Sequence, residues 1–137
     1  MFSIRSTVSK AEAKQYNPVV LAFVGDAVCS LYEREKLALQ TDLKSGEMQK
    51  RTSAKVSAKG QNDRLDKIRP LFTQEEEEIF LRGRNAKKGT RSKAATVAEY
   101  NRSTGFEAVM GFLYITGQTD RLDELLSAGE AEEGEKE

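Results

Sequence analysis

The chain of 137 residues has no histidine, no tryptophan and a single cysteine, Cys29. Zinc sites built from Cys and His are therefore excluded, as are the Ser-His and Cys-His pairs of nucleophilic catalysis. One cysteine also rules out an intrachain disulfide, and we expect Cys29, within an apolar segment, to pack in the core. Any metal site must use oxygen ligands, a donor set that favours Mg²⁺ or Mn²⁺.

Prolines, strand-like alternation and long apolar runs are also scarce. Only two prolines occur, and 38% of the residues are hydrophobic against 32% charged, a balance typical of one helical domain with a charged surface. Asp26 and Glu33 interrupt the longest apolar stretch, short of the roughly 18 residues that span a membrane. The N-terminal segment MFSIRSTVSK lacks the apolar centre of a signal peptide. We therefore predict an all-α, cytoplasmic protein.

The formal net charge of zero hides an acidic end. The chain holds 22 basic and 22 acidic residues, and residues 129–137, GEAEEGEKE, contain five of the acidic and one of the basic ones. Residues 1–128 thus carry 21 basic and 17 acidic side chains, a net charge of +4. The acidic end has no apolar residue larger than alanine, so we predict one domain over 1–128 and a disordered tail over 129–137.

The stretch from Asn17 to Leu39 predicts the central helix. Asn17 can cap its first N–H groups, and Pro18 suits the first helical position. Apolar residues recur there at helical spacing and define one face: Val20, Phe23, Val24, Ala27, Val28 and Leu31. Asp26 lies at the edge of this face, where an isolated carboxylate is costly to desolvate. Either a hydrogen-bond donor or a bound cation must compensate its charge.

Shorter helices are expected along the rest of the chain. The pattern predicts two helical segments over 46–69, with a break near residue 52 or 53. A helix over 73–81 should follow, opened by a Thr73–Glu76 capping box, and then an exposed basic loop over 82–93. A helix over 102–115 and a last helix that Asp120 caps complete the expected elements.

Glu107, in the apolar segment GFEAVMGFL, is the counterpart of Asp26 in FVGDAV. Both acids have small neighbours, Gly25 and Ala27 beside the first and Gly105 and Ala108 beside the second, which let helices approach closely. Two converging carboxylates with waters make an Mg²⁺ site, and Mg²⁺ can activate water beside a phosphate. Together with the basic loop, this favours a polyanionic substrate such as nucleic acid.

These segments resemble the ribonuclease III family. VVLAFVGDAV is similar to the family signature and FEAVMGFLY to its second acidic motif. The short chain, the absence of a double-stranded RNA-binding domain, the RGRNAK loop, the VSAKGQ segment and the EEEE run resemble Mini-ribonuclease III, the dimeric form reduced to the catalytic domain.

The resemblance implies a helical homodimer and metal-dependent endonucleolytic cleavage of double-stranded RNA. The products would have 5′-phosphate and 3′-hydroxyl ends with short 3′ overhangs, and the implied substrate is precursor 23S ribosomal RNA, with or without a ribosomal protein that presents it. Phe23 stands where the family places an aromatic that inserts into the partner subunit. The alternative is that Phe23 packs in the core of its own chain.

The sequence departs from full-length ribonuclease III at three acidic positions. Where that enzyme has glutamates four and seven positions before the signature Asp, this chain has Ala22 and Val19, and Thr104 replaces an Asp three positions before the second acid. Asp26 and Glu107 are therefore the only carboxylates predicted to be catalytic and to bind the metal.

A sequence-tolerant RNA surface is predicted around the basic loop, since A-form RNA is recognised through phosphates and 2′-hydroxyls. The candidate RNA-binding residues are Arg82, Arg84, Asn85, Lys87 and Lys88, with Lys55 and Lys59 four apart on one helix face. The alternative for the loop is an ordinary solvated segment. Two rival functions also stay open: a catalytically weak RNA-binding or ribosome-assembly factor, favoured by the reduced carboxylate set, and a helical scaffold that binds no RNA.

Overall fold

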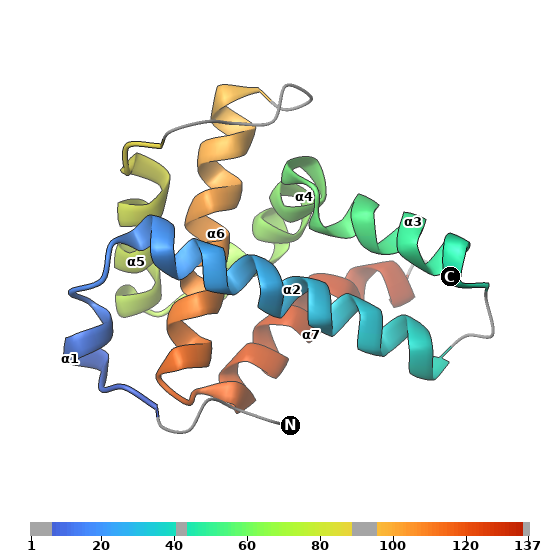
Figure 1. Cartoon of the computed structure of the whole chain (residues 1–137), viewed down its shortest axis with the longest axis horizontal. Helices are drawn as coiled ribbons and strands as arrows, with labels where there is room; N and C mark the ends of the chain where they lie inside the picture. Colours follow the sequence, from blue (N-terminus) through green and yellow to red (C-terminus); the bar gives the residue numbers. More distant parts are fainter. Residues whose placement is uncertain (1–6, 41–43, 89–95, 136–137) are drawn as a thin grey trace.

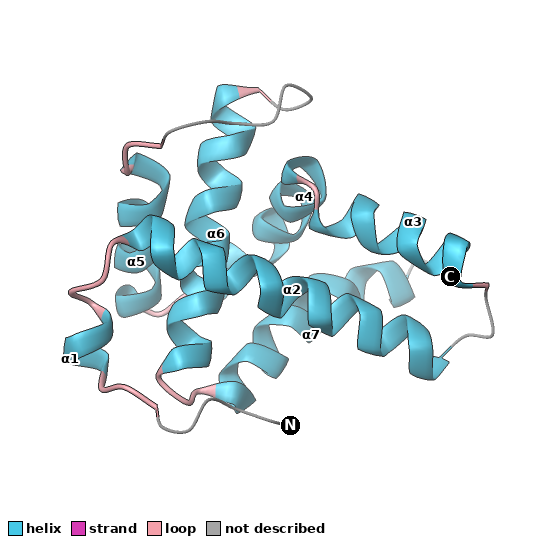
Figure 2. Ribbon diagram, in the orientation of Figure 1, coloured by secondary structure: helices cyan, strands magenta, loops and turns pink. Residues whose placement is uncertain are grey.

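The computed structural model describes residues 7–40, 44–88 and 96–135, and every regular element in these ranges is helical (Figures 1 and 2). The elements are α1 (Lys10–Ala13), α2 (Pro18–Gln40), α3 (Ser45–Val56), α4 (Ala58–Ile68), the 3₁₀ helix η1 (Arg69–Leu71), α5 (Gln74–Asn85), α6 (Val97–Ile115) and α7 (Thr119–Glu135). The all-α prediction is confirmed. None of the described helices is long and apolar enough to cross a membrane.

Local signals start α2 and α5 as predicted, and a further capping box starts α6. The Asn17 side chain accepts a hydrogen bond from the Val19 N–H at 2.9 Å, which satisfies one of the free donors at the start of α2. Thr73 and Glu76 form the reciprocal capping box of α5. Thr96 and Glu99 form a second capping box, which starts α6 at Val97, five residues before the predicted start.

The centre of the molecule is a close crossing of α2 and α6 (Figure 1). A Cβ atom added to Gly25 would lie 1.8 Å from the Glu107 carbonyl oxygen, and one added to Gly111 would lie 1.9 Å from the Leu21 carbonyl oxygen. The two helices therefore touch backbone to backbone, which only glycine allows at these positions. This contact carries Asp26, the residue after Gly25, to the side of Glu107.

The core surrounds this crossing. Its fully buried large side chains come from five helices and include Leu21, Leu65, Ile68, Ile79, Phe80, Phe106, Phe112, Leu113, Leu125 and Leu126. Cys29 is buried among them, as predicted, and burial raises the pKa of its thiol to about 12. The thiol is therefore protonated and unreactive at neutral pH.

Two helix boundaries predicted in the middle of the chain are wrong. The break in the 46–69 segment falls at Ser57, whose hydroxyl accepts from the Gly60 N–H and so caps α4. Lys55 and Lys59 thus lie on different helices rather than on one face. The segment 82–85, predicted as loop, is the last turn of α5, because Gly83 packs on the backbone of α6 at Gly105.

The start of the last helix also differs from its prediction. The helix begins at Thr119, so Asp120 lies inside its first turn rather than at the cap, and it extends to Glu135. It thus enters the segment predicted as a disordered tail. Glu130 accepts a hydrogen bond from the Tyr32 hydroxyl at 3.0 Å and pairs with Lys36, which ties α7 to α2.

Part of the apolar face of α2 points away from the core. Phe23 is 80% exposed, Val20 53% and Leu31 39%, and Ala27 between them is exposed as well. The alternative that Phe23 packs in the core of its own chain is therefore wrong. A row of exposed apolar residues on one helix is typical of an interaction surface.

The crossing leads to a stability prediction. Gly111→Ala places a methyl group against backbone that cannot move aside, so we expect the free energy of unfolding to fall by about 3 kcal/mol or more. Gly46→Ala is the matched control, because a Cβ at Gly46 meets nothing within 4 Å, and it should raise stability by about 0.5 kcal/mol. Urea denaturation followed by circular dichroism measures both, and equal effects would contradict the packing described here.

Candidate active site

A hollow of about 460 Å³ opens where α2, α6 and the junction of α3 and α4 meet. The residues that line it are Val19, Ala22, Phe23, Asp26, Val56, Ser57, Ala58, Lys88, Tyr100, Ser103, Thr104 and Glu107. The two predicted acids, far apart in the sequence, thus face the same space. Val19, Ala22 and Thr104, the three positions where full-length ribonuclease III has acids, line it too.

Asp26 and Glu107 lie within hydrogen-bonding reach of each other. Asp26 is exposed in the single chain and Glu107 is half-buried. Burial, the charge of Asp26 and the hydrogen bond with Asp26 raise the pKa of Glu107 to about 8. At neutral pH without metal, the Glu107 carboxyl group is therefore largely protonated.

A third side chain at the site was not found from the sequence. Gln61, fully buried on α4, donates from Nε2 to Glu107 Oε2 at 3.4 Å. Its carbonyl oxygen accepts from Arg64 Nη2 at 2.9 Å. The hydrogen bond from Gln61 and the positive charge of Arg64 lower the pKa of Glu107 and so oppose the larger effect of burial. The VSAKGQ segment that contains Gln61 was part of the family resemblance, but nothing in its spacing points to Glu107.

The donor set of the hollow fits a hard divalent cation. Two facing carboxylates concentrate negative charge, and they supply the oxygen ligands that Mg²⁺ prefers. Among the described residues no group of three or more Asp, Glu, His or Cys side chains gathers, so water must complete the shell, as is usual for Mg²⁺. The Thr104 hydroxyl donates to the Tyr100 carbonyl at 2.9 Å, which leaves its oxygen lone pairs as further acceptors.

The sequence and the fold have counterparts among known proteins. The family model described as "Ribonuclease III domain" matches residues 19–118. The chain belongs to the ribonuclease III family. It is therefore an endoribonuclease, and all residues that line the hollow fall within the matched segment.

Curated relatives of this ribonuclease III chain are named Mini-ribonuclease 3, which confirms the resemblance to that subgroup. The relative from Thermoanaerobacter sp. is 40% identical over 87% of this chain and 84% of its own. The relative from Streptococcus pneumoniae is 42% identical over 81% of this chain and 88% of its own. A crystal structure of a Fusobacterium nucleatum protein matches with a TM-score of 0.76 at 32% identity, over 83% of this chain and 93% of that one.

The predicted RNA-binding residues of this ribonuclease III chain differ in where they lie relative to the hollow. Lys88 lines the hollow, and its Nζ donates to the Arg84 and Ala86 carbonyls at 3.0 and 2.6 Å. Lys59 and Lys87 are exposed. Arg82, in contrast, anchors the segment before α2, because it donates to the Lys14 and Tyr16 carbonyls at 2.9 and 3.3 Å.

The remaining residues of the predicted RNA surface do not line the hollow. Arg84 donates to Asn85 Oδ1 at 3.1 Å at the end of α5. Lys55 lines a separate hollow between α2, α3 and α4.

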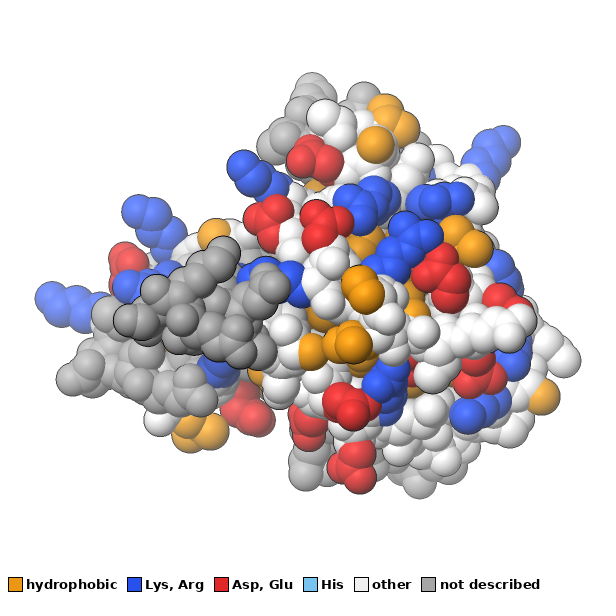
Figure 3. All heavy atoms as spheres, turned by 180° about the vertical axis from the view of Figure 1, so that it is seen from behind, with side chains coloured by type: hydrophobic (Ala, Val, Ile, Leu, Met, Phe, Trp, Pro, Cys, Tyr) orange, Lys and Arg blue, Asp and Glu red, His pale blue; other side chains and the backbone are white. Residues whose placement is uncertain are grey.

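On the face seen from behind, basic and acidic side chains are interspersed in the described part of the surface (Figure 3), so that face offers no patch of one sign.

The raised pKa of Glu107 predicts how stability depends on pH in metal-free protein. Between the ordinary value of 4.5 and the folded value of about 8, the folded state binds more protons than the unfolded state, so stability falls as pH rises. Glu107→Gln lacks this contribution. With EDTA present, we therefore expect the variant to gain stability relative to the wild type as the pH rises. The difference in the free energy of unfolding, variant minus wild type, should increase by on the order of 2 kcal/mol from pH 5 to pH 8.

Urea titrations at four pH values in this range measure the difference. Each protein is compared with itself across pH, so a constant offset caused by the substitution does not affect the result. Parallel stability curves for the two proteins would contradict the raised pKa.

Proposed function

We propose that the chain is a divalent-metal-dependent endoribonuclease that cleaves double-stranded RNA, with Asp26 and Glu107 as its catalytic and metal-binding pair. The observation that carries this proposal is the pairing of the two acids across one hollow, where the pKa of Glu107 rises to about 8. A divalent cation would offset the charge of two carboxylates that face one another in this way.

The residues of the hollow have distinct roles in this proposal. Asp26 and Glu107 would hold Mg²⁺, or Mn²⁺ in its place, and Thr104 and water would complete the shell. When bound, the cation supplies charge neutralisation at the scissile phosphate and acidification of a water molecule. Cleavage of this kind yields 5′-phosphate and 3′-hydroxyl ends.

RNA contacts are proposed for the basic residues around the hollow. Lys88 lines the hollow, and the exposed residues Lys59 and Lys87 directly follow or precede lining residues in the sequence. All three would bind backbone phosphates. Arg84 and Asn85 at the end of α5 would extend this surface, the latter towards a 2′-hydroxyl. Arg82 and Lys55 are assigned smaller roles, because Arg82 bonds to the segment before α2 and Lys55 lines another hollow.

The substrate proposed within this class is precursor 23S ribosomal RNA in the cytoplasm, presented with or without a ribosomal protein. The support is the similarity to relatives named Mini-ribonuclease 3 over most of both chains. One observation favours a second function, a catalytically weak RNA-binding or ribosome-assembly factor: no third acid joins Asp26 and Glu107 among the described residues.

A homodimer through the exposed face of α2 is part of the proposal. Phe23 and its apolar neighbours Val20, Ala27 and Leu31 are exposed in the single chain, and burial of such a row in an isologous contact is favourable. Phe23 also lines the hollow with Asp26, so the partner subunit would border the site. This contact would bring two hollows into one particle, which suits cleavage of both strands of a duplex.

Cleavage assays test the catalytic pair. Asp26→Asn and Glu107→Gln keep the side-chain shapes and remove one charge each, so we expect at least about a 100-fold loss of cleavage of double-stranded RNA with Mg²⁺, while metal-free RNA binding by electrophoretic mobility shift is retained. Asp123→Asn, an exposed acid on α7, is the matched control and should cleave normally. RNA bound but uncleaved by the wild type would instead support the second function.

Gel filtration with light scattering tests the dimer. Phe23→Asp puts a charge at the centre of the apolar row, and we expect it to convert a wild-type dimer into a folded monomer. Leu39→Asp is the control, since Leu39 is a similarly exposed apolar residue at 79% near the far end of the same helix. A wild type that elutes as a monomer at micromolar concentration would refute the proposed contact.

A further inference from the structure

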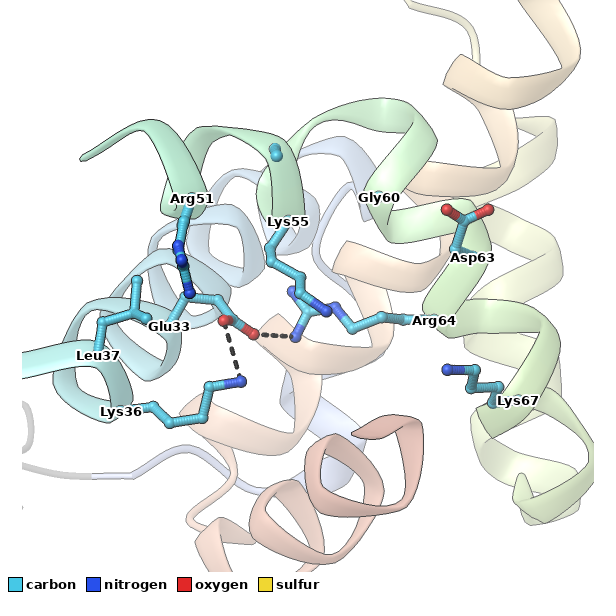
Figure 4. Close-up of a pocket in the computed structure, with 10 residues that line it drawn as sticks. Glu33, Lys36, Leu37, Arg51, Lys55, Gly60, Asp63, Arg64 and Lys67 are labelled. Atoms are coloured by element: carbon cyan, nitrogen blue, oxygen red, sulfur yellow. Dashed lines mark hydrogen bonds and ion pairs between the residues drawn. The ribbon is translucent and has the colours of Figure 1, made fainter. Parts of the chain in front are cut away.

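A line of buried polar side chains leads from Glu107 into the protein. Gln61 donates to Glu107 Oε2 and accepts from Arg64 Nη2, and Arg64 Nη1 donates to Glu33 Oε1 at 2.9 Å. Gln61 is 0%, Glu33 1% and Arg64 3% exposed. Figure 4 shows Glu33 between Arg64 and Lys36, whose Nζ lies 3.3 Å from Glu33 Oε2.

The polar line joins four helices. Glu107 belongs to α6, Gln61 and Arg64 to α4, and Glu33 to α2. Beyond Glu33, Lys36 pairs with Glu130 of α7. The outer end borders a hollow of about 440 Å³ between α2, α3 and α4 (Figure 4), so the line connects the candidate active site with a second surface.

The chemistry of the line fixes the orientation of the Gln61 amide. Arg64 has only donors and an ionised Glu107 has only acceptors, whereas an amide has one side of each kind. The amide therefore satisfies both neighbours only with its oxygen towards Arg64 and its nitrogen towards Glu107. The reverse orientation would set donor against donor and acceptor against acceptor. Glu33 holds Arg64 in turn, because the Arg64–Glu33 pair is buried at both ends.

Stability alone does not account for this arrangement. Apolar side chains of similar volume can often replace a buried ion pair without loss of stability. Arg64 Nε is also a buried nitrogen without a hydrogen-bond partner in the described part of the chain, which costs free energy. The line therefore fits a function in orientation better than a function in packing.

We propose that Gln61 is a positioning residue for Glu107, held in its orientation by Arg64 and Glu33. It donates a hydrogen bond to one oxygen of the Glu107 carboxylate and so keeps that group oriented towards Asp26. This inference rests on the proposed function of Glu107. Groups that orient a ligating carboxylate typically contribute 10- to 100-fold to activity or metal affinity.

Three variants test the polar line. Gln61→Met removes the amide at similar volume, and the double variant Glu33→Leu with Arg64→Met keeps the amide but removes what orients it. Asn62→Leu is the matched control, because Asn62 is a neighbouring buried amide of α4 that bonds to the Ala58 and Glu99 carbonyls and to Arg102 rather than to Glu107. Urea denaturation gives the folded fraction of each variant, and activities are compared per folded molecule.

The expected result is a fall in kcat of about 10- to 100-fold for Gln61→Met, with a smaller fall for the double variant. The KM for double-stranded RNA should stay within about twofold of wild type. Mn²⁺ binding without RNA, followed by electron paramagnetic resonance, should weaken in parallel with kcat, whereas Asn62→Leu should change stability alone.

The outcomes separate this inference from the proposed function. A wild type that neither cleaves RNA nor binds Mn²⁺ would overturn both. With an active wild type, unchanged kcat and Mn²⁺ binding in Gln61→Met would overturn the positioning role alone. An equal loss of kcat in Asn62→Leu would overturn it as well, because the effect would then reflect general packing of α4.

Discussion

The backbone contact between α2 and α6 is the constraint on which the rest of the structure depends. Gly25 lies against the Glu107 carbonyl group and Gly111 against the Leu21 carbonyl group, so the two backbones are in direct contact where the helices cross. Asp26 follows Gly25 directly, and Glu107 itself provides the opposing surface. The separation of the two acids is thus set by the backbones, which move little, and not by flexible side chains alone. Sites that rest on such rigid elements hold their geometry well.

The crossing concentrates negative charge at one point of an otherwise neutral chain. Near Glu107, the nearest polar support is the neutral amide of Gln61, and Arg64 is one residue further away along the polar line. The pair of acids is therefore compensated only partly by the protein, and the pKa of Glu107 rises. A proton or a cation completes the compensation. The same deficit of positive charge lowers the stability of the folded state at high pH and, in the proposed function, would favour a divalent ion in the hollow.

Features that depend on adjacent residues were predictable from the sequence. The start of α2 at Asn17 and the capping box at Thr73 follow from side chains that bond to backbone groups two or three residues away. The break at Ser57 uses the same kind of bond, but neighbouring serines and threonines offer equal candidates. A glycine between two arginines, as at Gly83, is a sequence pattern typical of a loop. Only the contact of Gly83 with Gly105 on α6 explains why the helix continues there.

Features that depend on distant residues were predictable only in part. The apolar face of α2 was evident from its period, but periodicity does not distinguish a core from a surface that another subunit covers, and Phe23 proved exposed. Asp26 and Glu107 stood out as isolated acids in apolar segments. Gln61, Arg64 and Glu33 did not, because ordinary polar residues gain their role only when the fold brings three helices together.

The central claim is that Asp26 and Glu107 together bind one cation in the hollow. Anomalous X-ray diffraction from crystals grown with Mn²⁺ tests this claim most directly. The account predicts one anomalous peak between the side chains, about 2.1 Å from an oxygen of Asp26 or Glu107 and joined to the other directly or through one water. A peak bound to one acid while the other points away, or no peak at the hollow in crystals grown with saturating Mn²⁺, would contradict it.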